Sequence, residues 1–386
     1  MTSAALVRDA LAWLDERETD MVATLRDWVE IGSFTDDRDG ANRCGDALVE
    51  AFSSLPLAVE RTESQRFGDH LVFSSRAPGP PILLVGHLDT VFPPGTFEGF
   101  RRDGALGRGP GALDMKGGLV VILMALRALE LALDTLPVRV VVVSDEEVGS
   151  PEGRAVIERH AGGARAALVF ESGRAGDEIV TDRKGTGAVR VTAAGVAAHA
   201  GNAHESGVNA IWALSAFVCE AQRLTDYAKG LTVNVGRIAG GRTKNTVPDE
   251  ASCELDFRFV HPDEGVGLER ALVAAALAAE ARVPGSKVTV HGGVARAPLV
   301  RTRESEALAT AYGAHAAAEG LGHALATRQG GGSDASTTSA LGIASIDALG
   351  PRGKGFHTLD EQVELATLVP KAKALARFLA AAPRTH

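Results

Sequence analysis

The sequence predicts an α/β protein in which a smaller α+β domain interrupts a larger domain built on a mainly parallel sheet. Three short apolar runs rich in β-branched residues have the length and composition of buried strands. A strongly apolar helical segment lies between the first two runs, and this β–α–β alternation is typical of a sheet with helices on both faces. In the middle of the chain, strands with alternating polar and apolar residues indicate a second, half-exposed sheet.

The larger domain is expected in two parts, over 1–181 and 296–386. Its expected elements are, in chain order, one or two amphipathic helices over 4–31, a helix over 40–52, a strand at 81–85, a helix over 117–133, strands at 138–143 and 167–170, and, after residue 299, an Ala-rich helix, a glycine-rich turn, a strand near 343–348 and a terminal helix.

The inserted domain is expected over 182–295, because the pattern of the strands changes near Thr181. Its strands and helices follow the order β-α-β-β-α-β, which is typical of a ferredoxin-like domain. They are expected at 188–193, 208–224 (helix), 231–238, 251–260, 267–281 (helix) and 287–291.

Composition excludes several classes of protein. The 386 residues are 45% hydrophobic and 23% charged, so the chain is not disordered, and its net charge of −9 disfavours a nucleic-acid binder. No uncharged apolar run reaches the roughly 18–20 residues of a membrane span, and the N-terminal segment lacks the apolar core of a secretory signal. The three widely spaced cysteines form no CxxC motif, which predicts reduced thiols in a cytoplasmic protein and excludes a thiolate zinc site.

Candidate chemistry begins where the first predicted strand ends. His87 follows this strand and can bind a metal through a neutral imidazole nitrogen, while Asp89 can orient the ring. Asp114 comes directly before an apolar helix, where a helix-capping carboxylate is an equally good interpretation. For the HxD pattern alone, a histidine satisfied within a turn remains the alternative.

Further acidic side chains follow the other two buried strands. Asp145, Glu146 and Glu147 repel one another unless a cation lies nearby or their pKa values rise, although a solvated acidic turn is also possible. Glu171 follows the third strand, and His357 lies near the C-terminus; each is a weak signal alone. Considered together, two imidazoles and three carboxylates fit two zinc ions bridged by one carboxylate and one water. These five residues are His87, Asp114, Glu147, Glu171 and His357.

The order of these motifs resembles the M20 family of metallopeptidases, and most closely its glutamate carboxypeptidase branch. The matching segments span most of the chain and are GHLDTV, GRGPGALDMKGG, SDEEVGS, FESGR, AAHAGNAHESGVNAI, KNTVPDEA, GGGSDAS and GKGFHTLDE. The resemblance implies a zinc-peptidase-like catalytic domain, an inserted lid or dimerisation domain, and a homodimer. It also implies a cis peptide bond after Asp114.

The resemblance also implies a role for each matching residue. His87 and Glu171 would hold one zinc ion, Glu147 and His357 the other, and Asp114 would bridge them. Glu146 would be the general base and Asp89 would orient His87. Cobalt or manganese would also fit this set of ligands.

In the inserted domain, the resemblance points to His199 as a catalytic histidine, commonly acting across a dimer interface. Substrate-binding positions would be Asn245, Arg258, Arg296, Gly331 and Gly332. A guanidinium suits a substrate carboxylate, although an ordinary surface arginine is the alternative for Arg258.

The expected function is therefore hydrolysis of an amide bond next to a free carboxylate, in a peptide or an N-acyl amino acid. The main alternative is deacylation of N-acyl amino acids, as by acetylornithine or succinyl-diaminopimelate deacylases. A non-catalytic metal-binding relative is a second alternative. A serine hydrolase is disfavoured because Ser333 is not in a GxSxG motif. Neither nucleic acid nor a membrane is an expected partner.

Overall fold

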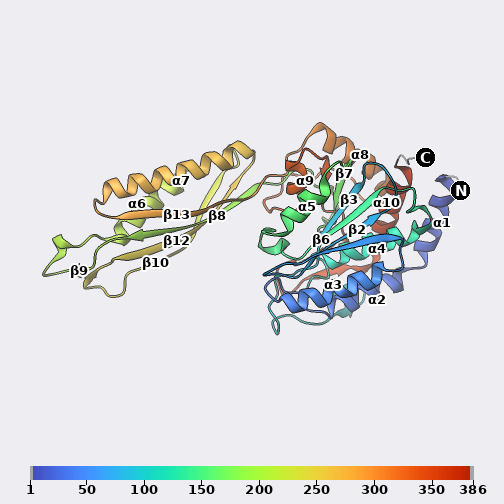
Figure 1. Cartoon of the computed structure of the whole chain (residues 1–386), viewed down its shortest axis with the longest axis horizontal. Coiled ribbons are helices and arrows are strands. Elements are labelled where there is room, and N and C mark those ends of the chain that lie inside the picture. Colours follow the sequence, from blue (N-terminus) through green and yellow to red (C-terminus); the bar gives the residue numbers. More distant parts are fainter. Residues whose placement is uncertain (1–2, 383–386) are drawn as a thin grey trace. The chain divides into compact units, whose positions relative to one another are not determined.

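The chain forms two units, one of which is largely a segment inserted into the other (Figure 1). The computed structural model describes residues 3–382. The first unit contains the described residues up to Asp182, Arg301–Arg328, and the residues from Ser333 onward. The second contains Arg183–Val300 and the short glycine-rich segment Gln329–Gly332.

A six-stranded sheet is the framework of the first unit. Its order is β1 (Leu57–Thr62), β2 (His70–Ser75), β6 (Val138–Val143), β3 (Ile82–His87), β7 (Ala166–Val169) and β14 (Ser345–Ile346). The last four strands run parallel, whereas β1 and β2 add an antiparallel edge, so the prediction of a mainly parallel sheet is confirmed. The edge strand β1 was not predicted, because most of its side chains are exposed and it lacks an apolar run.

Helices cover both faces of this sheet (Figure 1). They are α1 (Ser3–Asp15), α2 (Glu18–Val29), α3 (Arg38–Phe52), α4 (Lys116–Ala128), α5 (Gly153–Ala161), α8 (Arg303–Ala317), α9 (Ala335–Ala340) and α10 (Leu368–Ala381). Every residue of α4 from Lys116 to Leu126 is buried, and each large apolar side chain buried there contributes about 1.5–3 kcal/mol. The helix is shorter than predicted, since a 3₁₀ turn, η1 (Glu130–Ala132), takes up its expected end. The strand predicted at 343–348 is also shorter, because only β14 pairs with the sheet.

A second, small sheet in the first unit joins two distant parts of the chain. Its order is β15 (Gly353–Lys354), β16 (Gln362–Glu364), β5 (Leu106–Arg108) and β4 (Arg101–Asp103). A 3₁₀ turn, η4 (Leu365–Thr367), then leads into α10. These strands are too short for a periodic pattern, and the sequence did not predict them.

The second unit is a four-stranded antiparallel sheet with helices on one face (Figure 1). The sheet order is β10 (Thr232–Gly240), β12 (Glu250–Phe259), β8 (Gly185–Ala194) and β13 (Lys287–Arg296), and the helices are α6 (Ala210–Gln222) and α7 (Pro262–Arg282). The predicted order β-α-β-β-α-β is confirmed. A two-stranded pair, β9 (Ala198–His199) with β11 (Thr246–Val247), and a 3₁₀ turn, η3 (His204–Ser206), complete the unit.

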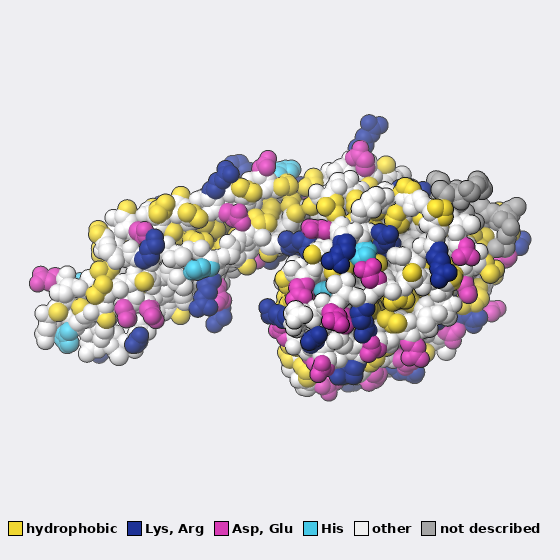
Figure 2. Space-filling model, in the orientation of Figure 1, with side chains coloured by type: hydrophobic (Ala, Val, Ile, Leu, Met, Phe, Trp, Pro, Cys, Tyr) yellow, Lys and Arg dark blue, Asp and Glu magenta, His cyan; other side chains and the backbone are white. Residues whose placement is uncertain are grey.

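The surface carries charges of both signs. On the face of the first unit in Figure 2, acidic and basic side chains are interspersed. Within residues 3–382, no helix is both long and apolar enough to cross a membrane.

Candidate metal centre

Three candidate side chains follow the carboxyl ends of neighbouring parallel strands. His87 is the last residue of β3, Glu147 lies in the 3₁₀ turn η2 (Glu146–Val148) after β6, and Glu171 comes shortly after β7. Because β6, β3 and β7 are adjacent and parallel, these ends meet at one edge of the sheet. The local fold therefore gathers one imidazole and two carboxylates from segments far apart in sequence.

Asp114 reaches the same edge from the start of α4. The peptide bond between Asp114 and Met115 is cis, as the resemblance implied. Close packing fixes this helix start, because a Cβ at Gly118 would lie 2.1 Å from the carbonyl oxygen of Phe170. The glycines after Asp114 thus let α4 approach the segment that carries Glu171.

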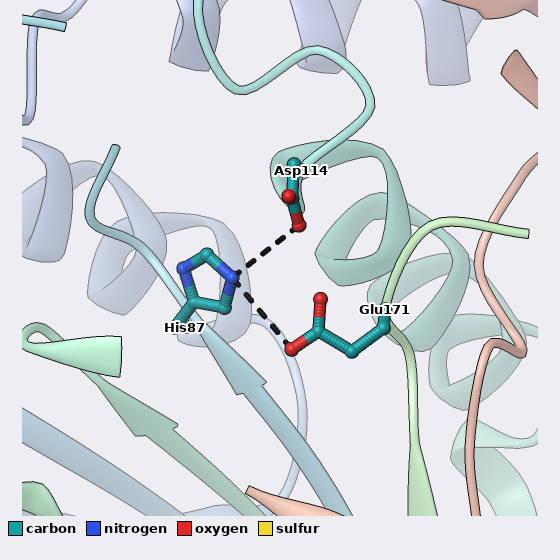
Figure 3. A group of neighbouring side chains, drawn as sticks. All are labelled: His87, Asp114 and Glu171. Carbon is teal, nitrogen blue, oxygen red and sulfur yellow. Dashed lines mark ion pairs between the residues drawn. The ribbon is translucent and has the colours of Figure 1, made fainter. Parts of the chain in front are cut away.

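The side chains form two groups that share Asp114. In the first group, His87 Nε2 lies 3.6 Å from Asp114 Oδ1 and 3.8 Å from Glu171 Oε1 (Figure 3). In the second, His357 Nε2 lies 3.4 Å from Asp114 Oδ2 and 3.0 Å from Glu147 Oε2. Within each group the candidate ligand atoms all lie within 4.8 Å of one another. All five residues named from the sequence as metal ligands therefore come together.

Burial and charge make these groups suited to cations. His87 Nε2 and Asp114 Oδ1 are buried and have no hydrogen-bond partner among the described residues, yet both face the first group. Burial, together with the charge of Asp114, raises the pKa of Glu171 to about 8. Burial is also the main cause that raises the pKa of Glu147 to about 7. A bound cation would satisfy the orphaned atoms and stabilise these carboxylates in their charged form.

The pKa values of both histidines are raised as well, which in their case favours the charged form. Hydrogen bonds to Asp114 and Glu147 raise the pKa of His357 to about 10. Burial opposes protonation of His87, but the nearby carboxylates of Asp114, Asp89 and Glu171 outweigh that penalty and raise its pKa well above the usual value. Without a cation, protons therefore balance the negative charge of the cluster.

Asp89 contacts His87 on the side of the ring that faces away from Asp114 and Glu171. His87 Nδ1 lies 3.1 Å from the Asp89 carbonyl oxygen and 3.3 Å from Oδ1, so a proton on Nδ1 leaves the Nε2 lone pair pointing at Asp114 and Glu171. The Asp89 carboxylate also accepts the backbone N–H groups of Glu146 and Glu147, each at 3.2 Å. Thr35 donates to Oδ2 at 2.8 Å, a contact between distant segments that the sequence did not predict.

Glu146 stands apart from the ligand groups. The turn η2 begins at Glu146, and of these two adjacent glutamates Glu147 belongs to a ligand group whereas Glu146 does not. The backbone of both residues is fixed by Asp89, whereas the Glu146 side chain is half-buried. Two adjacent glutamates thus occupy different surroundings.

In the second unit, His199 and Asn245 lie side by side. His199 ends β9, and its partner in the ladder is Thr246, directly after Asn245. The Asn245 carbonyl accepts the N–H of Ala200 at 3.0 Å. His199 Nδ1 accepts the N–H groups of Gly201 and Asn202 at 3.2 and 3.1 Å, so its proton is on Nε2, which can donate outward.

The other substrate-binding candidates meet at one end of the second unit's sheet. Arg258 makes a two-pronged ion pair with Asp256, at 2.8 and 2.7 Å, and donates to the Gly330 carbonyl at 3.3 Å. Arg296 is buried, and a Cβ at Gly332 would lie 2.8 Å from its Cδ. Two donors of Arg258 are therefore already occupied by a carboxylate on its own strand.

A third basic residue lies in this cluster. Arg183 is buried and donates to the Gly331 carbonyl at 3.3 Å. The glycine segment Gln329–Gly332 is thus contacted by Arg258 on β12, Arg296 on β13 and Arg183 just before β8. These three arginines are far apart in the sequence, and only the folded sheet brings them together.

Known proteins similar to this chain are amide-bond hydrolases. Carboxypeptidase G2 of Pseudomonas sp. (strain RS-16) is 30% identical over 368 residues, covering 93% of this chain and 88% of that protein. A succinyl-diaminopimelate desuccinylase of Acidiphilium cryptum is 29% identical, covering 94% and 98%. A tripeptidase structure from Staphylococcus aureus has the same fold, with a TM-score of 0.80 at 22% identity, covering 94% of this chain and 98% of that one.

The family model described as "Peptidase family M20/M25/M40" matches residues 83–381. This match begins at β3, includes both candidate ligand groups and the whole second unit, and ends in α10. The chain is therefore a metallopeptidase of the M20 family, with an M20 catalytic fold and candidate sites for metal ions.

Proposed function

We propose that this protein is a dizinc carboxypeptidase, similar to glutamate carboxypeptidases, which hydrolyses an amide bond next to a free carboxylate. The observation that carries the proposal is the sharing of Asp114 by two ligand groups, each with one histidine and one glutamate. His87 and Glu171 would hold one ion, Glu147 and His357 the other, with Asp114 between them. Imidazole and carboxylate donors suit zinc, and cobalt or manganese could replace it.

When bound, two such ions lower the pKa of water towards about 7 and polarise the amide carbonyl. The residues of the chain supply the proton transfers. Glu146 lies outside the two ligand groups, and in this proposal its carboxylate accepts a proton from the attacking water and gives it to the nitrogen of the leaving amine. Water and amide are thereby converted into a carboxylate and an amine.

His199 is proposed as an additional catalytic group. Its two backbone bonds to Nδ1 leave Nε2–H available to stabilise the negative oxygen that develops on the substrate carbonyl. We propose a homodimer in which His199 serves the neighbouring subunit. Exposed Ile211, Trp212 and Ile238 support this, because they lie on the packed elements α6 and β10, and exposed apolar patches are typical of protein–protein interfaces.

Asn245, Arg258, Arg296, Gly331 and Gly332 remain the proposed substrate-binding positions. Because Asp256 occupies two donors of Arg258, a substrate carboxylate at Arg258 would have to compete with that ion pair. The three cysteines are free thiols, which supports the proposed cytoplasmic location.

Deacylation of N-acyl amino acids is the second candidate function. It is favoured by the desuccinylase relative, which matches over 98% of its own length. The two functions differ in which half of the substrate determines selectivity.

The proposal is tested by assaying the zinc-loaded protein on peptides and N-acyl amino acids that vary in either half, with one member lacking the free carboxylate. Rapid release confined to C-terminal glutamate or aspartate supports the carboxypeptidase. Selectivity set by the acyl group instead supports the deacylase. Equal turnover of the member without a carboxylate contradicts both.

A further inference from the structure

Glu361 is a buried acid that the proposed chemistry does not use. It lies between the His357 loop and β16, and only 1% of its surface is exposed. Its Oε1 accepts the backbone N–H groups of Leu113 and Asp114 at 2.9 and 3.0 Å. Its Oε2 accepts the N–H of Gly111 at 3.3 Å. Three amide groups of one loop thus converge on a single carboxylate.

These bonds fix the peptide that carries Asp114. The Asp114 side chain extends from this backbone to His87 on one side and His357 on the other. A rotation of the loop would therefore shift both oxygens of Asp114 with respect to both histidines. Glu361 also lies shortly after His357 in the sequence, in the same short loop between β15 and β16.

Glu361 does not take part in either ligand group. Among the described residues the two groups consist of His87, Asp114 and Glu171, and of Asp114, Glu147 and His357. Both Glu361 oxygens are already hydrogen-bonded to backbone amides. The geometry thus separates a carboxylate that holds the loop from the carboxylates that face the metal positions.

We propose that Glu361 is a positioning residue which sets the metal affinity of both sites by fixing the Asp114 loop against the His357 loop. This inference rests on the proposed dinuclear centre. It assigns to Glu361 no contact with metal or substrate. Partners that orient metal ligands typically change metal affinity by 10–100-fold when they are removed, and a comparable effect is expected here.

The experiment is a titration of the metal-depleted full chain with Zn²⁺ by calorimetry and with Co²⁺ by visible absorption. The variants are Glu361→Ala and Glu361→Gln, with Asp360→Asn as the matched control. Asp360 is the adjacent acid, but its side chain is 83% exposed and pairs with Arg108 on the surface. Circular dichroism and thermal melting of each metal-depleted variant establish that it is folded.

We expect Glu361→Ala to weaken binding of both ions by about 10–100-fold and to alter the Co²⁺ spectrum. Glu361→Gln should restore part of the affinity, because its amide oxygen can still accept from Leu113 and Asp114 but its NH₂ group cannot accept from Gly111. Asp360→Asn should bind like the unsubstituted chain. Since Glu361→Gln keeps the shape and most of the bonds, it remains informative if the alanine variant does not fold.

The inference is overturned if folded Glu361 variants keep the metal affinities and Co²⁺ spectrum of the unsubstituted chain, even if their melting temperatures fall. That outcome would give Glu361 a role in stability alone. If the unsubstituted chain itself binds fewer than two ions, the proposed dinuclear centre fails instead, and the two failures are thereby distinguished.

Discussion

The two units differ in how many faces of their main sheet are covered by helices. In the first unit β3 and β7 are buried along their whole length and β6 nearly so, and helices cover both faces of the sheet. In the second unit β8 alternates buried and exposed residues, because helices cover only one face. A fully buried strand can present polar groups only beyond its end, whereas a half-exposed strand presents them along one face.

This difference separates the two kinds of candidate residue. In the first unit the candidate metal ligands lie at strand ends, just before α4 and in the loop between β15 and β16. They form one cluster that is largely buried except at His357, whose side chain is 50% exposed. In the second unit His199 lies on a short outer strand pair, and Arg258 lies within the exposed side of the sheet. Metal binding is therefore expected to depend on the first unit alone, and substrate turnover on both.

The most damaging change should be Asp114→Ala, because both ligand groups share this residue. Metal-assisted stabilisation is worth several kcal/mol, so a loss of about 5 kcal/mol would lower kcat/KM by about 10⁴-fold. Metal analysis should show that both ions are lost. Exposed Asp134→Ala is the control in the same unit, and retention of two ions by Asp114→Ala would contradict the shared site.

Glu146→Gln should separate chemistry from metal binding within the first unit. It removes the proton acceptor without removing a ligand, so kcat should fall by about 10²- to 10⁴-fold while two ions per chain remain. Steady-state kinetics and metal analysis of one preparation measure both quantities. A variant that keeps most of its rate would show that another group is the base.

His199→Ala tests how much the second unit contributes to turnover. Loss of one donor to a developing negative oxygen typically lowers kcat by about 10²- to 10³-fold, and the metal content should be unchanged. Exposed His204→Ala is the matched control, with wild-type kinetics expected. Loss of metal in His199→Ala would contradict the independence of the two units.

Metal affinity should fall as the pH is lowered. In the metal-free chain, Glu171 with a pKa of about 8 and His357 with a pKa of about 10 are both protonated at pH 7, whereas metal ligands must be deprotonated. Binding thus releases protons, and affinity should drop by about tenfold per pH unit for each proton released. Calorimetry in buffers of different ionisation enthalpy measures this release. Equal affinity at pH 6 and 8 would contradict it.

Sequence reasoning succeeded where local pattern determines position. The ends of three buried runs predicted where His87, Glu147 and Glu171 lie, because parallel neighbours share one edge of the sheet. For Asp114 the residues alone left a helix cap as an equal alternative, and His357 was a weak signal alone. Only the motif order of the family assigned both of them to the expected metal site. Their proximity arises from packing between segments far apart in the chain.

Other features depend on contacts that no local pattern encodes. The three backbone bonds to Glu361 join segments about 250 residues apart, and the small sheet of β4, β5, β15 and β16 has no periodicity to detect. The pairing of Arg258 with Asp256 was also missed, although residues two apart on a strand point to the same side.

Anomalous diffraction at the zinc absorption edge, from crystals of the zinc-loaded protein, would locate the metal ions in the first unit. We expect two peaks per chain on either side of the Asp114 carboxylate, one beside His87 and Glu171 and the other beside Glu147 and His357. A single peak, or peaks away from Asp114, would contradict a dinuclear centre contained in the first unit.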